Sequence, residues 1–310
     1  MPYNINDFDN KRYLTLNNFH KQTFGGKVFK VSLNGGFTCP NIDGTVGLGG
    51  CIYCSSVGSG DFAGDKNDDL LTQFNKTKVV LDKKWPNGKY IAYFQANTNT
   101  YAPIEKLEKL YTQAIDLPGV IGLSIATRPD AIADNVIELL SELNKKTYLT
   151  VELGLQSIHN KTLNLINRGH DFECFRSMLT KLRAQNINIV AHIINGLPGE
   201  TKDMMLQTAR VLSDIDVQGV KIHMLHILTD TALAELYEKE RFDLLTREEY
   251  VDIVCGQLEI LRSDIVIHRV TGDADFDKLV APQWIKKKFC VMNEIDKELK
   301  RRDSHQGIRA

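Results

Sequence analysis

Hydrophobic residues along this chain gather in two kinds of run. Runs of the first kind are short, rich in β-branched and aromatic residues, and apolar in series with few regularly alternating polar positions. Such runs are typical of strands that are buried on both faces, as in a parallel sheet. They predict strands over residues 28–33, 90–95, 120–127, 147–154, 187–195 and 219–228.

Runs of the second kind are amphipathic and lie between the predicted strands. They predict helices over residues 104–115, 134–146, 172–185 and 201–215. Strands that alternate with helices indicate right-handed βαβ units, in either a doubly wound open sheet or a full or partial barrel. Both architectures place functional groups at the carboxyl ends of the strands.

The chain has 310 residues and shows no internal repeat or linker. We expect an N-terminal extension over residues 1–27 and the α/β core over residues 28–228. A mainly helical C-terminal extension over residues 229–310, with one possible strand at 265–270, is expected to pack on that core.

The hydropathy pattern gives no sign of a membrane protein. No apolar run approaches the ~20 residues of a membrane span, and the N-terminal segment has no apolar centre of a secretory signal. We therefore expect a cytoplasmic protein without a membrane partner, whose cysteines stay reduced.

Charge is distributed unevenly along the chain, although the net charge is only −1. Residues 1–30 carry five Lys or Arg against two Asp, and residues 281–310 carry eight Lys or Arg against four Asp or Glu. The two basic ends are either solvated surfaces or a positive face for an anionic partner such as RNA.

Three of the six cysteines lie in one glycine-rich loop directly after the first predicted strand, "GGFTCPNIDGTVGLGGCIYCSSVGSGDF". Cys39, Cys51 and Cys54 have the spacing C-x11-C-x2-C. A structural zinc site normally needs a fourth ligand, and the nearest histidine, His20, precedes the strand. Three thiolates suit a [4Fe–4S] cluster that keeps one iron open for a small molecule.

The other three cysteines stand alone in helix-like segments. Cys174, Cys255 and Cys290 are expected to be buried packing residues rather than ligands.

The cysteine loop and the six predicted βα units together resemble the radical S-adenosylmethionine (SAM) superfamily. With "ATRPD" and "HRVTGDA", the loop is similar to the YtqA/YhcC-like branch, which is related to the Elongator catalytic subunit. The resemblance implies a partial (β/α)6 barrel of the TIM type. It also implies an enzyme that cleaves SAM reductively at a [4Fe–4S] cluster to a 5′-deoxyadenosyl radical, which removes a hydrogen atom from a substrate C–H bond.

The resemblance also suggests which residues contact SAM. "FQANTNT" follows the second strand, where the superfamily usually has a Gly-Gly-Glu-like turn over the SAM amino group; it is otherwise a plain Asn-rich turn. The candidates there are Gln95, Asn97, Thr98 and Asn99.

Further SAM candidates lie at the ends of later strands. Arg128, with Asp130, either approaches the SAM ribose or carboxylate or caps a loop. Gln156 and Arg168 match a Gln and an Arg that bind SAM in enzymes resembling the anaerobic coproporphyrinogen oxidase. Gly196 permits a close approach of adenine.

Four residues remain as candidates for catalysis. Glu152 is expected to face the barrel interior, and His192 stands where that family has an acid, so it is a candidate for SAM binding as well. His223 and His226 lie three apart on one predicted strand, so we expect one of them inside and one outside the barrel.

The branch resemblance implies a tRNA substrate, and the proposed reaction converts 5-carboxymethylaminomethyluridine at the wobble position into 5-aminomethyluridine. Lys286, Lys287 and Lys288, flanked by aromatic residues, are the candidate RNA contacts. An electron donor such as flavodoxin or ferredoxin is the other implied partner. The alternatives are a radical SAM enzyme for a small molecule or peptide, and a non-enzymatic metal-binding protein that binds RNA.

Overall fold

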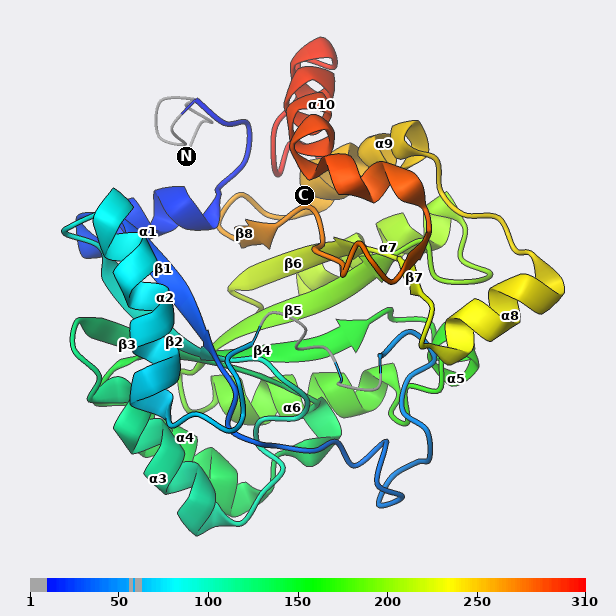
Figure 1. Ribbon diagram of the computed structural model, residues 1–310. Helices are drawn as coiled ribbons and strands as arrows, with labels where there is room; N and C mark the ends of the chain where they lie inside the picture. The colour runs from blue at the N-terminus through cyan, green and yellow to red at the C-terminus, as the bar shows by residue number, and fades with distance from the viewer. Residues whose placement is uncertain (1–9, 56–57, 59–62) are drawn as a thin grey trace.

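A curled parallel sheet forms the centre of the protein. The structure is a computed structural model that describes residues 10–55, 58 and 63–310. The sheet has seven strands in the order β1-β2-β3-β4-β5-β6-β8 (Figure 1). Their bounds are β1 Val28–Leu33, β2 Lys89–Phe94, β3 Val120–Thr127, β4 Tyr148–Gln156, β5 Asn188–Asn195, β6 Gly219–Met224 and β8 Val266–Arg269.

Helices cover the outer face of this sheet and extend beyond its last strand (Figure 1). They are α1 Leu16–Phe24, α2 Leu70–Lys84, α3 Ile104–Ile115, α4 Asp134–Asn144, α5 Asn160–Leu165, α6 Phe172–Arg183, α7 Lys202–Asp214, α8 Ala232–Glu240, α9 Arg247–Ile260 and α10 Lys288–Arg301. Two 3₁₀ helices, η2 Pro129–Ala131 and η3 Gln283–Lys287, and an antiparallel pair, β7 Ile227–Leu228 with β9 Leu279–Ala281, complete the elements.

The predicted fold class is confirmed, because the parallel sheet curls into a half-barrel with helices outside and a helical C-terminal region. The seventh strand, β8, pairs with β6 and confirms the possible strand at 265–270, although it joins the sheet of the core. The strand predicted over 219–228 is interrupted rather than continuous. β6 ends at Met224, although the Leu225 amide still donates to Asn195 O of β5 at 2.9 Å, and residues 227–228 form the separate strand β7, which pairs with β9.

The N-terminal segment spans the gap between the two edges of the half-barrel. Thr15 bridges to Ile267 of β8, and the Ile267 amide donates to Leu14 O at 2.8 Å. Helix α1 then packs against both β8 and β1, the two edge strands of the sheet (Figure 1). The segment therefore covers the side on which the sheet itself does not close.

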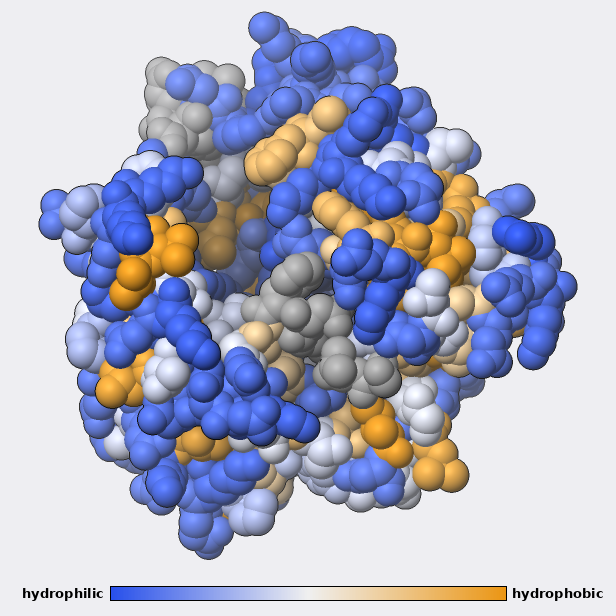
Figure 2. Space-filling model, in the orientation of Figure 1, coloured by the Kyte–Doolittle hydropathy of each residue, from blue (hydrophilic) through white to orange (hydrophobic). Residues whose placement is uncertain are grey.

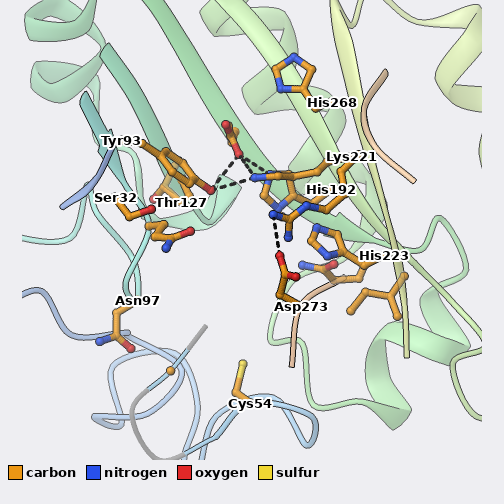
Figure 3. Close-up of a pocket in the computed structure, with 18 of the residues that line it drawn as sticks. Ser32, Cys54, Tyr93, Asn97, Thr127, His192, Lys221, His223, His268 and Asp273 are labelled. Atoms are coloured by element: carbon orange, nitrogen blue, oxygen red, sulfur yellow. Dashed lines mark hydrogen bonds and ion pairs between the residues drawn. The ribbon is translucent and has the colours of Figure 1, made fainter. Parts of the chain in front are cut away.

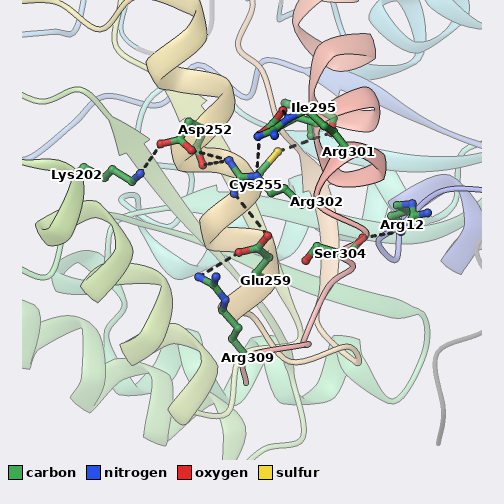
Figure 4. Close-up of polar contacts among 11 residues, drawn as sticks. Arg12, Lys202, Asp252, Cys255, Glu259, Ile295, Arg301, Arg302, Ser304 and Arg309 are labelled. Carbon is green, nitrogen blue, oxygen red and sulfur yellow. Dashed lines mark hydrogen bonds and ion pairs between the residues drawn. The ribbon is translucent and has the colours of Figure 1, made fainter.

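A cluster of polar side chains lies outside the sheet interior, under the C-terminal tail, where α9 packs against α7 and α10 (Figure 4). Glu259, only 2% exposed, is paired with Arg302 at 3.5 Å and with Arg309 at 3.3 Å. Arg302 also binds Asp252 and Glu298, at 2.5 and 2.8 Å. These pairs hold the C-terminal tail on α9.

Among the helices within the described ranges, none combines the length and the apolar character that crossing a membrane would take.

Candidate active site

A cavity of about 680 Å³ fills the interior of the half-barrel. Residues of α1 line one part of it, and the cysteine loop and the carboxyl ends of the strands line another. Figure 2 shows the corresponding face of the molecule hollowed near its centre, with mainly hydrophilic residues around the hollow. In Figure 3, Cys54 and Asn97 lie across this cavity from Tyr93, Lys221 and His268.

Cys39, Cys51 and Cys54 all line the cavity, as expected for residues that act together. The turn that carries the last two is closed by the Cys54 amide, which donates to Cys51 O at 2.9 Å. The loop is also fixed to the segment after α5, because the Asn167 side chain donates to Gly50 O at 2.7 Å. Sequence-distant segments therefore hold the thiols at the cavity wall.

The thiols have the chemistry of soft-metal ligands. A hydrogen bond from Cys54 lowers the pKa of Cys51 well below its ordinary value, and the nearby Arg168 guanidinium lowers it further. Arg168 Nη1 lies 3.5 Å from Cys51 Sγ. In the described part of the chain, no three His, Cys, Asp or Glu side chains are arranged to hold a single metal ion. Three thiol ligands and a buried cation beside them fit an anionic iron–sulfur cluster.

Gln156 and Arg168, twelve residues apart in the sequence, converge at the end of β4. Arg168 Nη2 donates to Gly154 O at 2.6 Å. A Cβ atom at Gly154 would lie 2.6 Å from that nitrogen and 2.9 Å from Gln156 Nε2, so only glycine leaves both side chains their positions. Arg168 is 6% exposed, and its Nε has no hydrogen-bond partner within the described ranges. Such a buried donor beside the cysteines is suited to an anionic group of a ligand.

The Asn-rich segment after β2 reaches the cavity with three of its four candidates. Gln95, Asn97 and Thr98 line the cavity, whereas Asn99 is fully buried behind it. The Asn99 amide nitrogen donates to Ala126 O at 2.7 Å, which ties this segment to the end of β3.

The candidates after β3 and β5 differ in position. Arg128 lines the cavity and binds the Asp130 carboxylate through two nitrogens, at 2.9 and 2.7 Å. Gly196 is not among the described residues that line the cavity. It has a φ of 87° and faces Leu245, to which an added Cβ would lie at 3.1 Å.

His223 and His226 both line the cavity, so the expectation that they face opposite sides of one strand is wrong. Because β6 ends at Met224, only His223 belongs to it, and the turn that follows brings His226 to the same side. The period-two rule applies only while a strand continues.

A network of polar side chains surrounds Glu152 inside the half-barrel. Its carboxylate is fully buried and accepts hydrogen bonds from Ser124 at 2.8 Å, Tyr93 at 3.0 Å and His192 at 2.7 Å. Lys221 Nζ lies 2.8 Å from the same carboxylate, and Lys30 forms an ion pair with it. We call these six residues, contributed by the first six strands of the sheet, the Glu152 network.

The charge states of this network follow from burial and from the neighbouring ions. Burial alone would raise the pKa of Glu152, but Lys221 and Lys30 hold that pKa well below its usual range. Burial lowers the pKa of His192 to about 4 and that of Lys221 to about 8. Near pH 7 the network therefore holds one carboxylate, two ammonium groups and a neutral imidazole.

Sequence reasoning found Glu152 and His192 but missed Lys30, Tyr93 and Lys221. The available signal was a lysine in the middle of each of two apolar strands, "VFKVSL" and "GVKIHM". A buried ammonium group is costly unless it is paired, so a lysine in such a position calls for a partner or a ligand.

Lys286, Lys287 and Lys288 do not line the cavity. Lys286 and Lys287 are exposed on η3, whereas Lys288 forms an ion pair with Asp273, which does line it. The neighbouring Phe289 is 71% exposed, so an aromatic side chain is presented to solvent beside these lysines.

The lone cysteines have three different environments. Cys255 is buried as expected, and Cys174 is half-buried. Cys290 is exposed, so its assignment as a buried packing residue is wrong. It lies on the outward side of α10, whereas Val291 beside it is fully buried.

The comparisons with known proteins agree with this fold. The family model of the Radical SAM superfamily matches residues 46–212, and that of the Radical_SAM C-terminal domain matches residues 217–301. The chain therefore belongs to the radical SAM superfamily, an enzyme family that uses a [4Fe–4S] cluster and SAM.

Individual relatives narrow this similarity to one branch. The chain is 52% identical to the uncharacterized protein YtqA of Bacillus subtilis, over 96% of this chain and 92% of that protein. It is 36% identical to protein YhcC of Escherichia coli, over 89% of this chain and 88% of that protein. The branch recognised in the sequence is thereby confirmed.

A solved structure shares the fold over most of the chain. It is the archaeal Methanocaldococcus infernus Elp3, with a TM-score of 0.68 and 19% identity over 91% of this chain and 64% of that one. A likeness at this identity supports the half-barrel architecture alone.

Proposed function

We propose that this enzyme modifies the 5-substituent of the wobble uridine of tRNA, converting 5-carboxymethylaminomethyluridine into 5-aminomethyluridine. The observation that carries the proposal is the cavity, which contains the three cysteines and the Glu152 network and whose described lining residues include six Lys or Arg but two Asp or Glu. A cavity of this charge suits an anionic substituent of a substrate.

Relatives support the choice of tRNA. A tRNA uridine(34) acetyltransferase of Methanocaldococcus infernus is 27% identical over 156 residues, which is 49% of this chain and 29% of that protein. Elongator complex protein 3 of Saccharomyces cerevisiae is 24% identical over 53% of this chain and 29% of that protein. The similarity covers a minor part of those proteins, so only the site in the shared segment is carried over.

The proposed roles divide the cavity into two parts. Cys39, Cys51 and Cys54 hold the cluster, and Gln156 and Arg168 hold SAM beside it. Gln95, Asn97, Thr98 and Arg128 are further proposed SAM contacts, because they line the same cavity as the cysteines. The Glu152 network is left for the substrate. When bound, the cofactors supply a 5′-deoxyadenosyl radical that removes one hydrogen atom from the substrate.

The overall reaction balances as an oxidation followed by hydrolysis. The cofactors, when bound, would take one hydrogen atom from the carbon next to the carboxylate. Transfer of one electron from that carbon to an iron–sulfur or flavin carrier, with loss of a proton from the nitrogen, would then give an imine. Water cleaves the imine to 5-aminomethyluridine and glyoxylate.

His192 is suited to receive the proton from the substrate nitrogen. Its Nε2 donates to the ionised Glu152 carboxylate, so the neutral ring carries its proton there and Nδ1 is left as the acceptor. His223, whose ring centroid lies 5.5 Å from that of His192, extends the same wall of the cavity.

The test is nucleoside mass spectrometry of tRNA. Anaerobically reconstituted protein, SAM and a flavodoxin or ferredoxin reducing system are incubated with tRNA that carries 5-carboxymethylaminomethyluridine. We expect 5-aminomethyluridine, glyoxylate and 5′-deoxyadenosine in equal amounts. If SAM is cleaved but the tRNA is neither bound nor changed, the substrate is a small molecule or peptide instead. The non-enzymatic alternative is set aside because the chain belongs to an enzyme superfamily.

A further inference from the structure

The Glu152 network has more positive charge than its own carboxylate balances. Lys30 and Lys221 both contact Glu152, and their side chains are 16% and 9% exposed. No second Asp or Glu is paired with either ammonium group among the described residues. Two buried cations that share one anion repel each other, and the repulsion is relieved when a second anion arrives.

The neighbouring histidines do not supply or remove charge near pH 7. Burial keeps the pKa values of His223 and His268 well below their ordinary range, as it does for His192. These rings line the same part of the cavity in the neutral form. His223 Nε2 and His268 Nδ1 are buried and have no hydrogen-bond partner within the described residues. The wall therefore offers polar contacts as well as net positive charge.

The last strand repeats this excess of cations at the edge of the network. Arg269 of β8 is in register with Lys221 of β6 and lines the cavity. Its partner Asp273, at 3.2 Å, is shared with Lys288. Two cations again share one carboxylate, so this pair does not neutralise Lys30 or Lys221.

This excess of positive charge lies on the side of the cavity where the substrate is expected, and not on the side where the iron–sulfur cluster is expected. Cys54 faces Lys221 across the cavity in Figure 3, and the cations beside the cysteines are Arg168 and Arg128 instead. Lys221 Nζ also lies 3.0 Å from the Tyr93 hydroxyl, so its position is fixed before any ligand binds.

We propose that Lys221 and Lys30 form an anion-binding subsite that holds the carboxylate of the substrate's amino-acid-like substituent. This inference rests on the proposed function, whose substrate carries such a carboxylate beside the carbon that is oxidised. Charge-assisted contacts to a fixed pair of ammonium groups place that carbon and select the acid over neutral analogues.

The experiment compares two anticodon stem-loop RNAs on the reconstituted enzyme. One carries 5-carboxymethylaminomethyluridine, and the other carries the corresponding neutral carbamoyl derivative. For the acid, Lys221→Met should lower kcat/KM about 10- to 100-fold, as removal of a charged hydrogen bond does. For the amide it should change kcat/KM less than about 3-fold, and Lys221→Arg should restore part of the preference for the acid. Lys297→Met, on the exposed side of α10, is the matched lysine control.

Two outcomes would overturn the subsite. In the first, the wild-type enzyme has the same kcat/KM for the acid and the amide, as it would if the lysines bound a backbone phosphate. In the second, Lys221→Met lowers kcat/KM for both substrates by the same factor. The proposed function would stand in each case, since turnover of the modified uridine is measured directly.

A second measurement does not depend on RNA. N-methylglycine at millimolar concentration should raise the melting temperature of the wild-type holoenzyme and not that of Lys221→Met, whereas N-methylacetamide should raise neither. A Lys221-dependent shift without any turnover of tRNA would keep the subsite and reject the proposed function. No shift with N-methylglycine, together with equal use of acid and amide, would reject the subsite.

Discussion

Two regions of this protein contain the same three residue types and use them differently. The cavity has the buried residues Cys51, Glu152 and Arg168, whereas the cluster under the C-terminal tail has the buried residues Cys255 and Glu259 with the half-buried Arg302 (Figure 4). The three nitrogens of Arg302 that can donate all have acceptors, on Glu298, Glu259 and Asp252.

In the cavity the corresponding side chains are not fully paired with other protein groups. Arg168 Nε has no partner in the described part of the chain, and the pKa of Cys51 is lowered. Burial instead raises the pKa of Cys255 to about 12. An arginine whose nitrogens are all paired, as in Arg302, indicates a stabilising role, whereas a buried arginine donor left unpaired at a cavity indicates a group that can bind a ligand.

The largest difference should come from the two cysteines. Cys51→Ala should abolish iron binding and 5′-deoxyadenosine formation, as should Cys39→Ala and Cys54→Ala, because the cluster loses a ligand. Cys255→Ala should keep iron and activity and lower the free energy of unfolding by about 1–2 kcal/mol, since it opens a small cavity in the core. Iron and sulfide analysis checks the first expectation, and denaturant unfolding checks the second. Cys174→Ala and Cys290→Ala are the controls, which should keep the iron. A full iron content in Cys39→Ala would reject the ligand assignment.

Substitution of the two buried glutamates, Glu152 in the cavity and Glu259 under the C-terminal tail, should give a smaller difference between the two regions. Glu152→Gln leaves Lys30 and Lys221 buried without a carboxylate, so it should lower the free energy of unfolding by about 3–5 kcal/mol and also reduce turnover. Glu259→Gln should lower it by about 1–2 kcal/mol and leave turnover per folded molecule unchanged, because Arg302 keeps two other carboxylates. Equal losses of turnover in the two variants would contradict the division between the regions.

The two regions also differ in how far the sequence revealed them. The cysteine site was predictable, because its spacing is local and its residue type has few other uses. The strands were predictable from their apolar runs, but the end of β6 was not. The mainly apolar run continues through "HMLHIL", and the break arises because Ile227–Leu228 pair with β9, a strand more than 50 residues later in the sequence.

Only part of the Glu152 network could be predicted from the sequence, for a physical reason. Lys30 and Lys221 stand inside strands, and whether they face the cavity depends on the parity of each strand and on the direction in which the sheet curls. Those properties arise from tertiary structure. The pairing of Glu259 with the C-terminal tail was not visible at all, since its partners are 43 and 50 residues away.

The pH dependence should distinguish a lysine-based site from an arginine-based cluster. Burial lowers the pKa of Lys221 to about 8, so the ammonium form predominates below that pH and is progressively lost above it. Affinity for the acidic substrate should therefore fall above about pH 8, and the fall should move to higher pH in Lys221→Arg. The charged or titratable groups that contact or act on Lys221 share the interior of the half-barrel: Lys30, Tyr93, Glu152, His192, His223, His268 and Arg269. A KM for the acid that stays flat between pH 7 and about pH 9 would contradict this assignment.

The smallest effect concerns η3 and the start of α10, where Lys286 and Lys287 are exposed and Lys288 is half-buried. Replacing Lys286, Lys287 and Lys288 together by Ala should weaken tRNA binding and reduce its salt slope by about 0.7–0.9 for each phosphate that is no longer neutralised. The matched control is Lys297→Ala with Lys300→Ala, on exposed positions of α10. Because Lys288 is paired with Asp273 at the cavity, a double variant that keeps Lys288 separates phosphate binding from that ion pair. Equal salt slopes for the wild-type protein and the triple variant would mean that these lysines only solvate the surface, and the tRNA would then have to bind elsewhere around the cavity.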